Sequence, residues 1–161
     1  MISQPQEHFD DTLFQSDLTH FTVFSVTGAD ASNFLQGQLT QDMELVTENQ
    51  AVLSAYCSPK GRVLGSFLIW KSASTENEPV FKFLVRADIA EMLLKRLRMY
   101  VMRSKVVFTQ ETLDIKGIWS SSIEELGKRL ELDLKQIPAW RVASKDGCIW
   151  IALPDVANNK R

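Results

Sequence analysis

Residues 21–42 read FTVFSVTGADASNFLQGQLTQD, and this stretch decides the fold. The aromatic and β-branched run over 21–26 predicts a strand, which a Thr-Gly pair ends. Apolar residues then recur at helical spacing and predict a helix over 31–39; they are Phe34, Leu35 and Leu39. Asp30 precedes this helix, where its carboxylate can cap the first turn and favour the positive end of the helix dipole.

A second block, YCSPKGR at 56–62, is a turn between two strands. Further along the chain, alternating apolar residues predict another strand, and the clearest helix of the sequence follows it with Asp88 as its N-cap. The elements expected after the first helix are strands over 51–57, 62–70, 80–85 and 105–109, and a helix over 88–102.

This order of elements favours an α+β fold, an antiparallel sheet with helices on one face. We expect a flexible polar arm over 1–16, a first α+β subdomain over 17–110, and the start of a second, incomplete α+β subdomain over 111–161. The predicted core of the first subdomain consists of Phe34, Leu35, Leu39, Phe67, Ile69, Phe83, Leu93 and Leu97. The second subdomain should contain a strand over 113–119, a serine-capped helix up to 132, and strands over 140–142 and 148–153.

Composition excludes several classes of protein. The 161 residues carry a net charge of −2, which gives no global attraction to nucleic acid or to acidic membranes. No apolar stretch is long enough to span a membrane, so we expect a cytoplasmic protein without direct membrane binding. Two cysteines far apart, Cys57 and Cys148, suit a reducing compartment, and apolar neighbours predict that Cys148 is a buried strand residue.

Catalytic and metal-binding motifs are missing from the sequence. Neither histidine has cysteine or carboxylate neighbours at metal-ligand spacing, and the glycines form no dinucleotide or phosphate loop. Positive residues gather at the end of the second helix; they are Lys95, Arg96, Arg98, Arg103 and Lys105. Such a basic helix end is most often a solvated face, and otherwise a docking patch for RNA or a polyglutamate tail, so support for nucleic-acid binding is weak.

The two blocks together resemble the N-terminal half of the YgfZ family, folate-binding relatives of the glycine-cleavage aminomethyltransferase (T-protein). The resemblance rests on GADASNFLQGQLTQD at 28–42, PKGR at 59–62 and YVMRSK at 100–105, in this order and spacing. The family's Lys-Gly-Cys-Tyr-x-Gly-Gln-Glu segment, which carries its functional cysteine, has no match here. Asp146-Gly147-Cys148 is only a superficial echo of that segment.

The resemblance implies a T-protein/YgfZ-like folate-binding fold. In the aminomethyltransferases an Asp-Asp pair follows the turn, and the alignment places Gly65 and Ser66 at that pair, so neither position supplies a carboxylate. We therefore expect no catalytic residue of the transferase kind. The family function that the resemblance implies is binding of tetrahydrofolate or a derivative, in support of iron–sulfur enzyme assembly or repair and, indirectly, of tRNA modification. Iron–sulfur client proteins would be the partners.

The resemblance also assigns a folate pocket. Leu35, Leu39 and Tyr56 would border an apolar slot for the pterin ring. Lys60, Arg62 and Arg86 would supply cations for the carboxylates of the glutamate tail, the arginines as bidentate forks. The plain alternative for 60–62 is a solvated turn in which Gly61 supplies a positive φ.

Two other functions stay open at this point. The chain could be an aminomethyltransferase-like enzyme whose acid comes from another residue, such as Asp42 or Asp88. It could also be a folate-free domain that mediates protein contacts.

Overall fold

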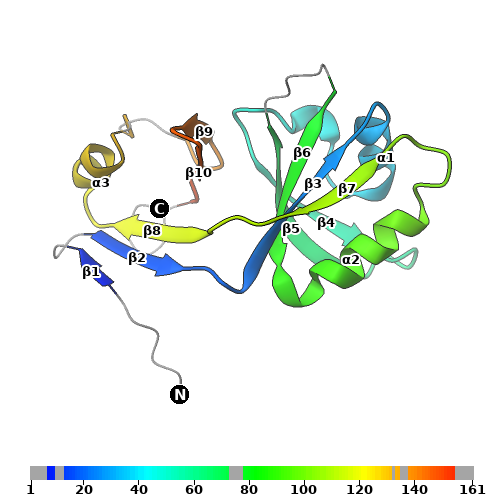
Figure 1. The fold of residues 1–161 in the computed structure, drawn as a ribbon, viewed down its shortest axis with the longest axis horizontal. Helices are drawn as coiled ribbons and strands as arrows, with labels where there is room; N and C mark the ends of the chain where they lie inside the picture. Colours follow the sequence, from blue (N-terminus) through cyan, green and yellow to red (C-terminus); the bar gives the residue numbers. More distant parts are fainter. Residues whose placement is uncertain (1–6, 10–12, 73–77, 132, 135–137, 155–161) are drawn as a thin grey trace. The chain divides into compact units, whose positions relative to one another are not determined.

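The structure is a computed structural model, which describes residues 7–9, 13–72, 78–131, 133–134 and 138–154. The chain divides into two compact units. One unit is residues 20–113, and the other combines residues 1–19 with residues 114–161. Each unit has its own antiparallel strands (Figure 1), and each is described by itself below.

The unit of residues 20–113 is built on a five-stranded sheet in the order β4-β5-β6-β3-β7. Every neighbouring pair in this sheet is antiparallel. The strands are β3 (Phe21–Thr27), β4 (Val52–Cys57), β5 (Val63–Ser72), β6 (Val80–Arg86) and β7 (Val107–Glu111). This mixture of helices and antiparallel sheet confirms the predicted fold class.

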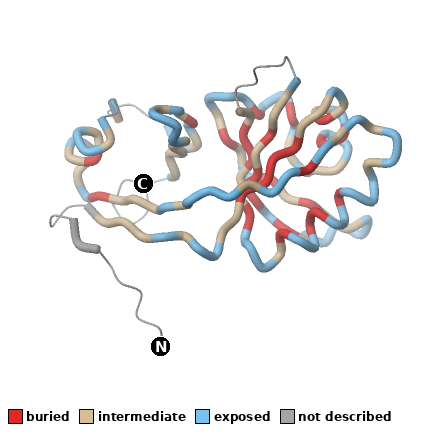
Figure 2. The backbone as a smooth tube through the Cα atoms, viewed as in Figure 1, coloured by how far each residue is buried: buried red, intermediate tan, exposed pale blue. Residues whose placement is uncertain are grey.

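Two helices and a short 3-10 turn accompany this sheet: α1 (Ala31–Gln38), α2 (Ala87–Met99) and η1 (Met43–Leu45). Alternate side chains of a strand point to opposite faces, and one set from each strand packs with the helices in a single apolar cluster. Figure 2 shows the buried positions of this unit gathered between the sheet and the helices. The predicted core is confirmed, with Leu39 at its half-buried margin.

Aromatic rings form the centre of the core. Phe24 and Phe83 face each other across β3 and β6, with ring centroids 4.5 Å apart and nearly parallel planes. Phe67 on β5 adds a tilted contact with Phe83 at 4.9 Å. Burial of each such side chain stabilises the fold by about 1.5–3 kcal/mol, so three adjacent strands are held together through their side chains as well as their backbones.

The second helix is shorter than expected and begins earlier. Its N-cap position is Arg86, with an extended backbone, and Asp88 lies in the first turn, so the predicted Asp88 cap is wrong. The helix ends at Met99 rather than at 102. The backbone of Met102 has a φ of +44°, which cannot continue a right-handed helix.

The beginning of α1 is joined to the segment before β7. Asp30 stands at the N-cap position but makes no side-chain cap; its carboxylate accepts a hydrogen bond from the backbone N–H of Lys105 at 2.7 Å. Gly28 has a φ of +116°, and a Cβ there would overlap the backbone carbonyl of Lys105. The Thr-Gly pair therefore allows the β3–α1 turn to lie directly against the chain that enters β7.

The other unit contains a three-stranded antiparallel sheet in the order β1-β2-β8. Its strands are β1 (Glu7–Phe9), β2 (Leu13–Asp17) and β8 (Lys116–Ser120). The described residues of the expected polar arm thus form strands, and β8 begins later than the strand expected over 113–119. Phe14 stacks on Trp119 at 5.8 Å, and Lys116 pairs with Asp17 at 2.9 Å. These partners are about a hundred residues away in sequence, which local patterns do not reveal.

The rest of this unit consists of α3 (Ile123–Leu130) and a hairpin of β9 (Val142–Lys145) and β10 (Cys148–Ile151). Ser122 caps α3 by accepting from the N–H of Glu125 at 3.2 Å, as the serine run predicted. The last residue of the predicted helix, 132, lies outside the described residues, as does the tail from 155. Cys148 is exposed, so its predicted burial is wrong: β10 pairs only with β9, and this end of the hairpin is uncovered.

Membrane insertion through a helix finds no support in the described part of the chain. None of its helices combines the length and the apolar character that a bilayer crossing requires.

Exchange of two glycines tests the turn between β3 and α1. Gly28→Ala should lower the free energy of unfolding by at least ~1–3 kcal/mol, because alanine is strained at this positive φ and its Cβ overlaps Lys105. Gly37→Ala is the matched control, since Gly37 lies within α1 with open space around it, and should stabilise by ~0.5–1 kcal/mol. Urea denaturation measures both; equal effects of the two exchanges would contradict the close approach.

Candidate functional site

The turn between β4 and β5 forms the base of a shallow, open hollow of about 400 Å³. Its lining residues are Ser58, Pro59, Lys60, Arg62 and Leu64. The turn is held by the N–H of Ser58 donating to the carbonyl of Arg62 at 2.8 Å, and by the N–H of Gly61 donating to the carbonyl of Ser58 at 2.9 Å. Gly61 has a φ of +74°, as expected for this turn.

The two cations of this turn are exposed and uncompensated. Among the described residues, Lys60 and Arg62 have no carboxylate partner within ion-pair distance. Pro59 and Leu64 supply apolar wall beside them. The hollow therefore combines a small apolar surface with two free positive charges, a combination suited to a carboxylate-bearing ligand.

The strand pair next to this turn is irregular. Tyr56 pairs with Gly65 and Cys57 pairs with Val63, so Leu64 is an extra residue in β5. Leu39 forms an isolated bridge with Tyr56, which brings the end of α1 against the end of β4. Leu39 and Tyr56 are thus neighbours, as expected for two residues of one slot, but the Tyr56 side chain is only 6% exposed.

Leu35 occupies a different environment. It is fully buried in the core beneath α1 and has no surface that a ligand could reach in this conformation. It serves to pack the helix on the sheet.

Tyr56 is influenced by burial and by two residues near the C-terminal end of α2. Burial is the largest cause that raises the pKa of Tyr56; the nearby Tyr100 raises it further, and Arg96 lowers it. The neutral phenol is therefore favoured in the folded protein.

Arg86 is engaged in an ion pair. Its guanidinium donates two hydrogen bonds to the carboxylate of Asp88, at 3.0 and 2.6 Å, on the exposed first turn of α2. This pair lowers the pKa of the Asp88 carboxyl and raises the pKa of Arg86. A second carboxylate at Arg86 would meet a guanidinium whose charge Asp88 already compensates.

The three predicted cations do not converge on one hollow. Phe67 of β5 pairs with Val85 of β6, so Arg86 lies beside Ser66. Ser66 is four residues along β5 from Arg62, a separation of about 13 Å along an extended strand. The structure thus brings Lys60 and Arg62 together and leaves Arg86 apart from them, at the end of the interior strand β6.

Gly65, the position aligned with the first transferase carboxylate, lies under α2. A Cβ at Gly65 would be 3.2 Å from Cδ1 of Ile89 and 3.9 Å from Cδ2 of Leu93. Ser66 is exposed and points to the opposite face of the sheet. An aspartate at 65 would therefore enter an apolar layer rather than an open site.

Asp42 and Asp88, the two other candidates for a catalytic acid, both already have hydrogen-bond partners. Asp42 accepts a hydrogen bond from the N–H of Glu44 at 3.0 Å and so caps η1. Asp88 is held by Arg86 with a lowered pKa, which disfavours proton donation at neutral pH. Metal chemistry has no visible basis either, because the described residues contain no group of three or more His, Cys, Asp or Glu that could hold an ion.

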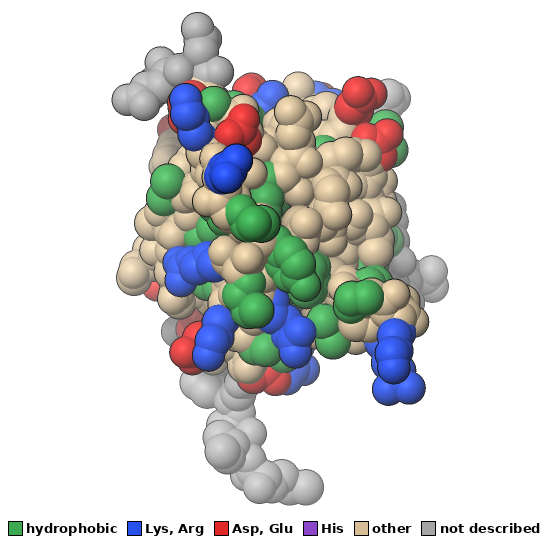
Figure 3. Space-filling view, turned by 90° about the vertical axis from the view of Figure 1, so that its right-hand side faces the viewer, with side chains coloured by type: hydrophobic (Ala, Val, Ile, Leu, Met, Phe, Trp, Pro, Cys, Tyr) green, Lys and Arg blue, Asp and Glu red, His purple; other side chains and the backbone are tan. Residues whose placement is uncertain are grey.

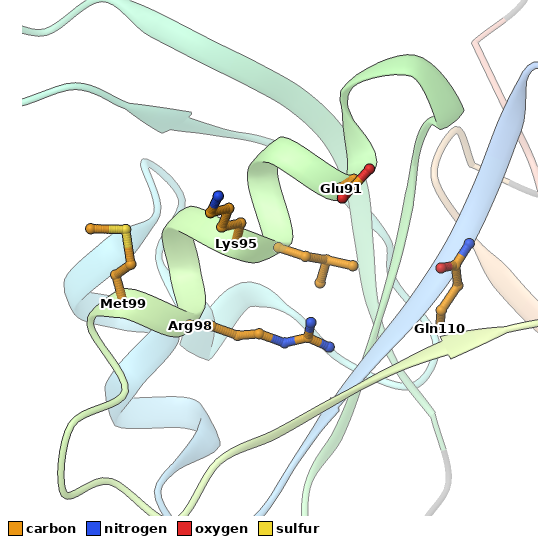
Figure 4. Close-up of a pocket in the computed structure, with 6 residues that line it drawn as sticks. Glu91, Lys95, Arg98, Met99 and Gln110 are labelled. Atoms are coloured by element: carbon orange, nitrogen blue, oxygen red, sulfur yellow. The ribbon is translucent and has the colours of Figure 1, made fainter.

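A second hollow, of about 640 Å³, lies between α2 and β7 (Figure 4). Its lining residues are Glu91, Leu94, Lys95, Arg98, Met99 and Gln110. The Arg98 guanidinium donates to the carbonyl of Phe108 at 3.1 Å and lies 5.9 Å from the centre of that ring. Sequence reasoning noted the cations here but missed this hollow, because its other wall comes from a strand that only the fold brings next to α2.

Comparison with solved structures identifies the class of fold. The chain superposes on glycine cleavage system aminomethyltransferase T from Bartonella henselae with a TM-score of 0.70 and 14% sequence identity, over 81% of this chain and 35% of that one. At this identity the likeness shows the fold alone. The chain has the T-protein fold.

Sequence comparison adds closer relatives. The chain is 30% identical to the tRNA-modifying protein YgfZ of Escherichia coli over 58% of its own length, and 35% identical to that of Hamiltonella defensa over 55%. It is 31% identical to an uncharacterized protein of Haemophilus influenzae over 74% of its length. It spans only 27%, 25% and 41% of these three relatives. No family model matches the chain. The protein is YgfZ-like in sequence, through a partial match.

Substitution at the aligned carboxylate positions tests the packing under α2. Gly65→Asp should lower the free energy of unfolding by ~1–3 kcal/mol, since it buries a carboxyl group among Ile89 and Leu93 without a partner. Ser66→Asp, on the exposed face, should change stability by less than ~0.5 kcal/mol. Chemical denaturation of both variants is the measurement, and a Gly65→Asp variant as stable as Ser66→Asp would contradict the packing.

The tyrosine environment has a consequence for alkaline pH. Because the folded pKa of Tyr56 is raised above its ordinary 10.0, the unfolded chain releases this proton first. The contribution of Tyr56 to stability is complete below pH 10 and is lost as the pH rises toward the folded pKa. Tyrosinate absorbance of wild type minus that of Tyr56→Phe isolates this group, since Tyr100 is the other tyrosine of the chain. A midpoint at or below 10 would refute the burial effect.

Proposed function

We propose that this chain binds a reduced folate at the turn hollow of Ser58, Pro59, Lys60, Arg62 and Leu64. The observation that carries the proposal is the pair of free cations, Lys60 and Arg62, beside an apolar wall in a chain with the T-protein fold. A folate tail ends in carboxylates, and a guanidinium binds a carboxylate with two charge-assisted hydrogen bonds.

The residues present fit this ligand class. The hollow of about 400 Å³ lies within the range of ~300–1,000 Å³ that is usual for small-molecule sites. Leu39 and Tyr56 adjoin the turn from the end of α1 and from β4 and support it from the core side. Lys60 and Arg62 would hold the tail, and Pro59 and Leu64 would contact the ring system. A bound tetrahydrofolate would supply one-carbon carrier chemistry.

The wider role in this proposal is that of YgfZ, named a tRNA-modifying protein in the relatives. The chain would act as the folate-binding part of a protein that supports assembly or repair of iron–sulfur enzymes, in a cytoplasmic setting, and through them tRNA modification. Aminomethyl transfer receives no support from the positions that were candidates for its acid. Gly65 lies under α2, Asp42 caps η1, and Asp88 is paired with Arg86.

Titration calorimetry with tetrahydrofolate tests the binding proposal. One charge-assisted hydrogen bond contributes ~1.5–3 kcal/mol, so Arg62→Ala should weaken binding by about ten- to a hundredfold. Lys60→Ala should weaken it less, because a flexible ammonium keeps much of its hydration. Arg86→Ala should have the smallest effect of the three, since Asp88 already occupies that guanidinium.

Two controls make this test specific. Lys128→Ala removes an exposed cation of α3 and should leave folate binding unchanged. A pterin without the glutamate tail should bind wild type and Arg62→Ala equally, because it lacks the carboxylates that Arg62 would hold. Absence of tetrahydrofolate binding, or binding that is indifferent to both Lys60 and Arg62, would refute the proposed site.

A further inference from the structure

A second surface, apart from the turn hollow, gathers cations and exposed apolar side chains around the hollow between α2 and β7. Its residues are Lys95, Arg98, Met99, Met102, Arg103 and Lys105, which we call the α2–β7 surface. Met99 and Met102 are 70% and 88% exposed. We propose that this surface docks an acidic amphipathic helix of a partner protein.

The placement of this surface follows from the topology. Lys95, Arg98 and Met99 line the hollow from the helix side, and Gln110 lines it from β7 (Figure 4). The segment 100–106 continues the chain from Met99, which lines the hollow, to the start of β7. Figure 3 shows this side of the molecule, with apolar side chains in the middle and Lys and Arg around them.

Cations predominate at this surface, although Glu91 lines one end of the hollow and the Asp30 carboxylate accepts from the backbone N–H of Lys105. Between Glu91 and Glu111 the sequence contains five Lys or Arg and no Asp or Glu, although the net charge of the whole chain is −2. In the described part of the protein, Lys95, Arg103 and Lys105 have no ion-pair partner. Three free cations within a short segment attract an acidic partner and repel a basic one.

The helix dipole explains the presence of only some of the cations at this surface. Cations in the last turn of a helix are stabilised by the helix dipole, which would explain Arg98. Arg103 and Lys105 follow the end of α2 and gain little from it, because the effect falls off within one turn.

Exposed apolar side chains favour a protein over other anionic partners. Methionines adapt their shape to a partner and are frequent at protein-binding surfaces, whereas contacts to nucleic acid phosphates are made by polar and charged groups. A concave site of about 640 Å³ can accept the side chains of a helix that lies in it, as in other helix-in-groove complexes. A flat bilayer would leave this hollow unfilled.

The edge of β7 also favours a helix over an added strand. The carbonyl of Phe108 already accepts from Arg98, so part of the free edge is closed to a pairing strand. Glu91 lies at the other end of the hollow, two helical turns from Met99. The acidic residues of the partner should therefore lie toward Arg98 and Arg103, away from Glu91.

The experiment uses three labelled synthetic peptides and fluorescence anisotropy on the full chain. The first is a helix with leucines on one face and glutamates on the other. The second has the same composition in scrambled order, and the third has lysines in place of the glutamates. We expect the first peptide to bind at least tenfold more tightly than either of the others, and more weakly as salt rises.

Variants of the chain then locate the site. Met99→Ser and Arg103→Glu should each weaken binding of the first peptide fivefold or more, and Glu91→Lys should tighten it. Leu53→Ser and Lys128→Glu are the matched controls: Leu53 is 59% exposed on β4, at the opposite edge of the sheet, and Lys128 is exposed on α3. Neither control should change the affinity. Thermal unfolding of each variant confirms that it is folded.

Other occupants have distinct outcomes, and each would overturn the proposal. Equal affinity for the ordered and scrambled peptides would show that the surface attracts acidic peptides by charge alone and does not recognise a helix. Tighter binding of single-stranded RNA or of anionic lipid vesicles, weakened by the same variants, would assign the surface to those partners. Sedimentation showing a dimer of this chain that Met102→Ser abolishes would identify a second copy as the occupant. Folate titration of the same variants should be unchanged, so this test is independent of the folate proposal.

Discussion

The packing of α1 and α2 against one face of the five-stranded sheet is the constraint on which the rest of the larger unit depends. Phe24 and Phe83 stack at its centre, and both helices bury their apolar sides on this layer. Since side chains alternate along a strand, this packing decides for every position of β5 whether it faces the helices or the other side. It places Gly65 beneath α2 and leaves Ser66 exposed. A carboxylate at position 65 would therefore enter the apolar layer under α2.

The same arrangement separates two surfaces with different physical character. At the β4–β5 turn, two cations stand beside a small apolar wall, which suits a small ligand with carboxylates. Between α2 and β7, a larger hollow is bordered by cations and exposed methionines, which suits a macromolecular partner. A ligand at the turn and a partner at α2–β7 would contact different residues of the same unit.

Both surfaces carry exposed cations, although the net charge of the whole chain is negative. The net charge of −2 conceals five Lys or Arg without any acid between Glu91 and Glu111. Some cations elsewhere are neutralised locally: Lys82 is paired with Glu111 at 2.8 Å, and Arg86 with Asp88 at 2.6 Å. The pair with Asp88 takes two of the five N–H donors of Arg86 and compensates its charge, whereas Lys60 and Arg62 have no such partner among the described residues.

The sequence by itself determined the elements and the core of the larger unit, because periodicity reports which side of a strand or helix is apolar. The strand over 21–26, the helix after it and the β4–β5 turn all occur close to their predicted positions, and Gly61 has the positive φ that its turn requires. Only the tertiary structure decided what depends on neighbours distant in sequence. The pairing of β2 with β8, the burial of Gly65 by α2 and the exposure of Cys148 belong to this group. Local sequence does not specify which segment covers a residue, and coverage decides whether a side chain packs the core or meets a ligand.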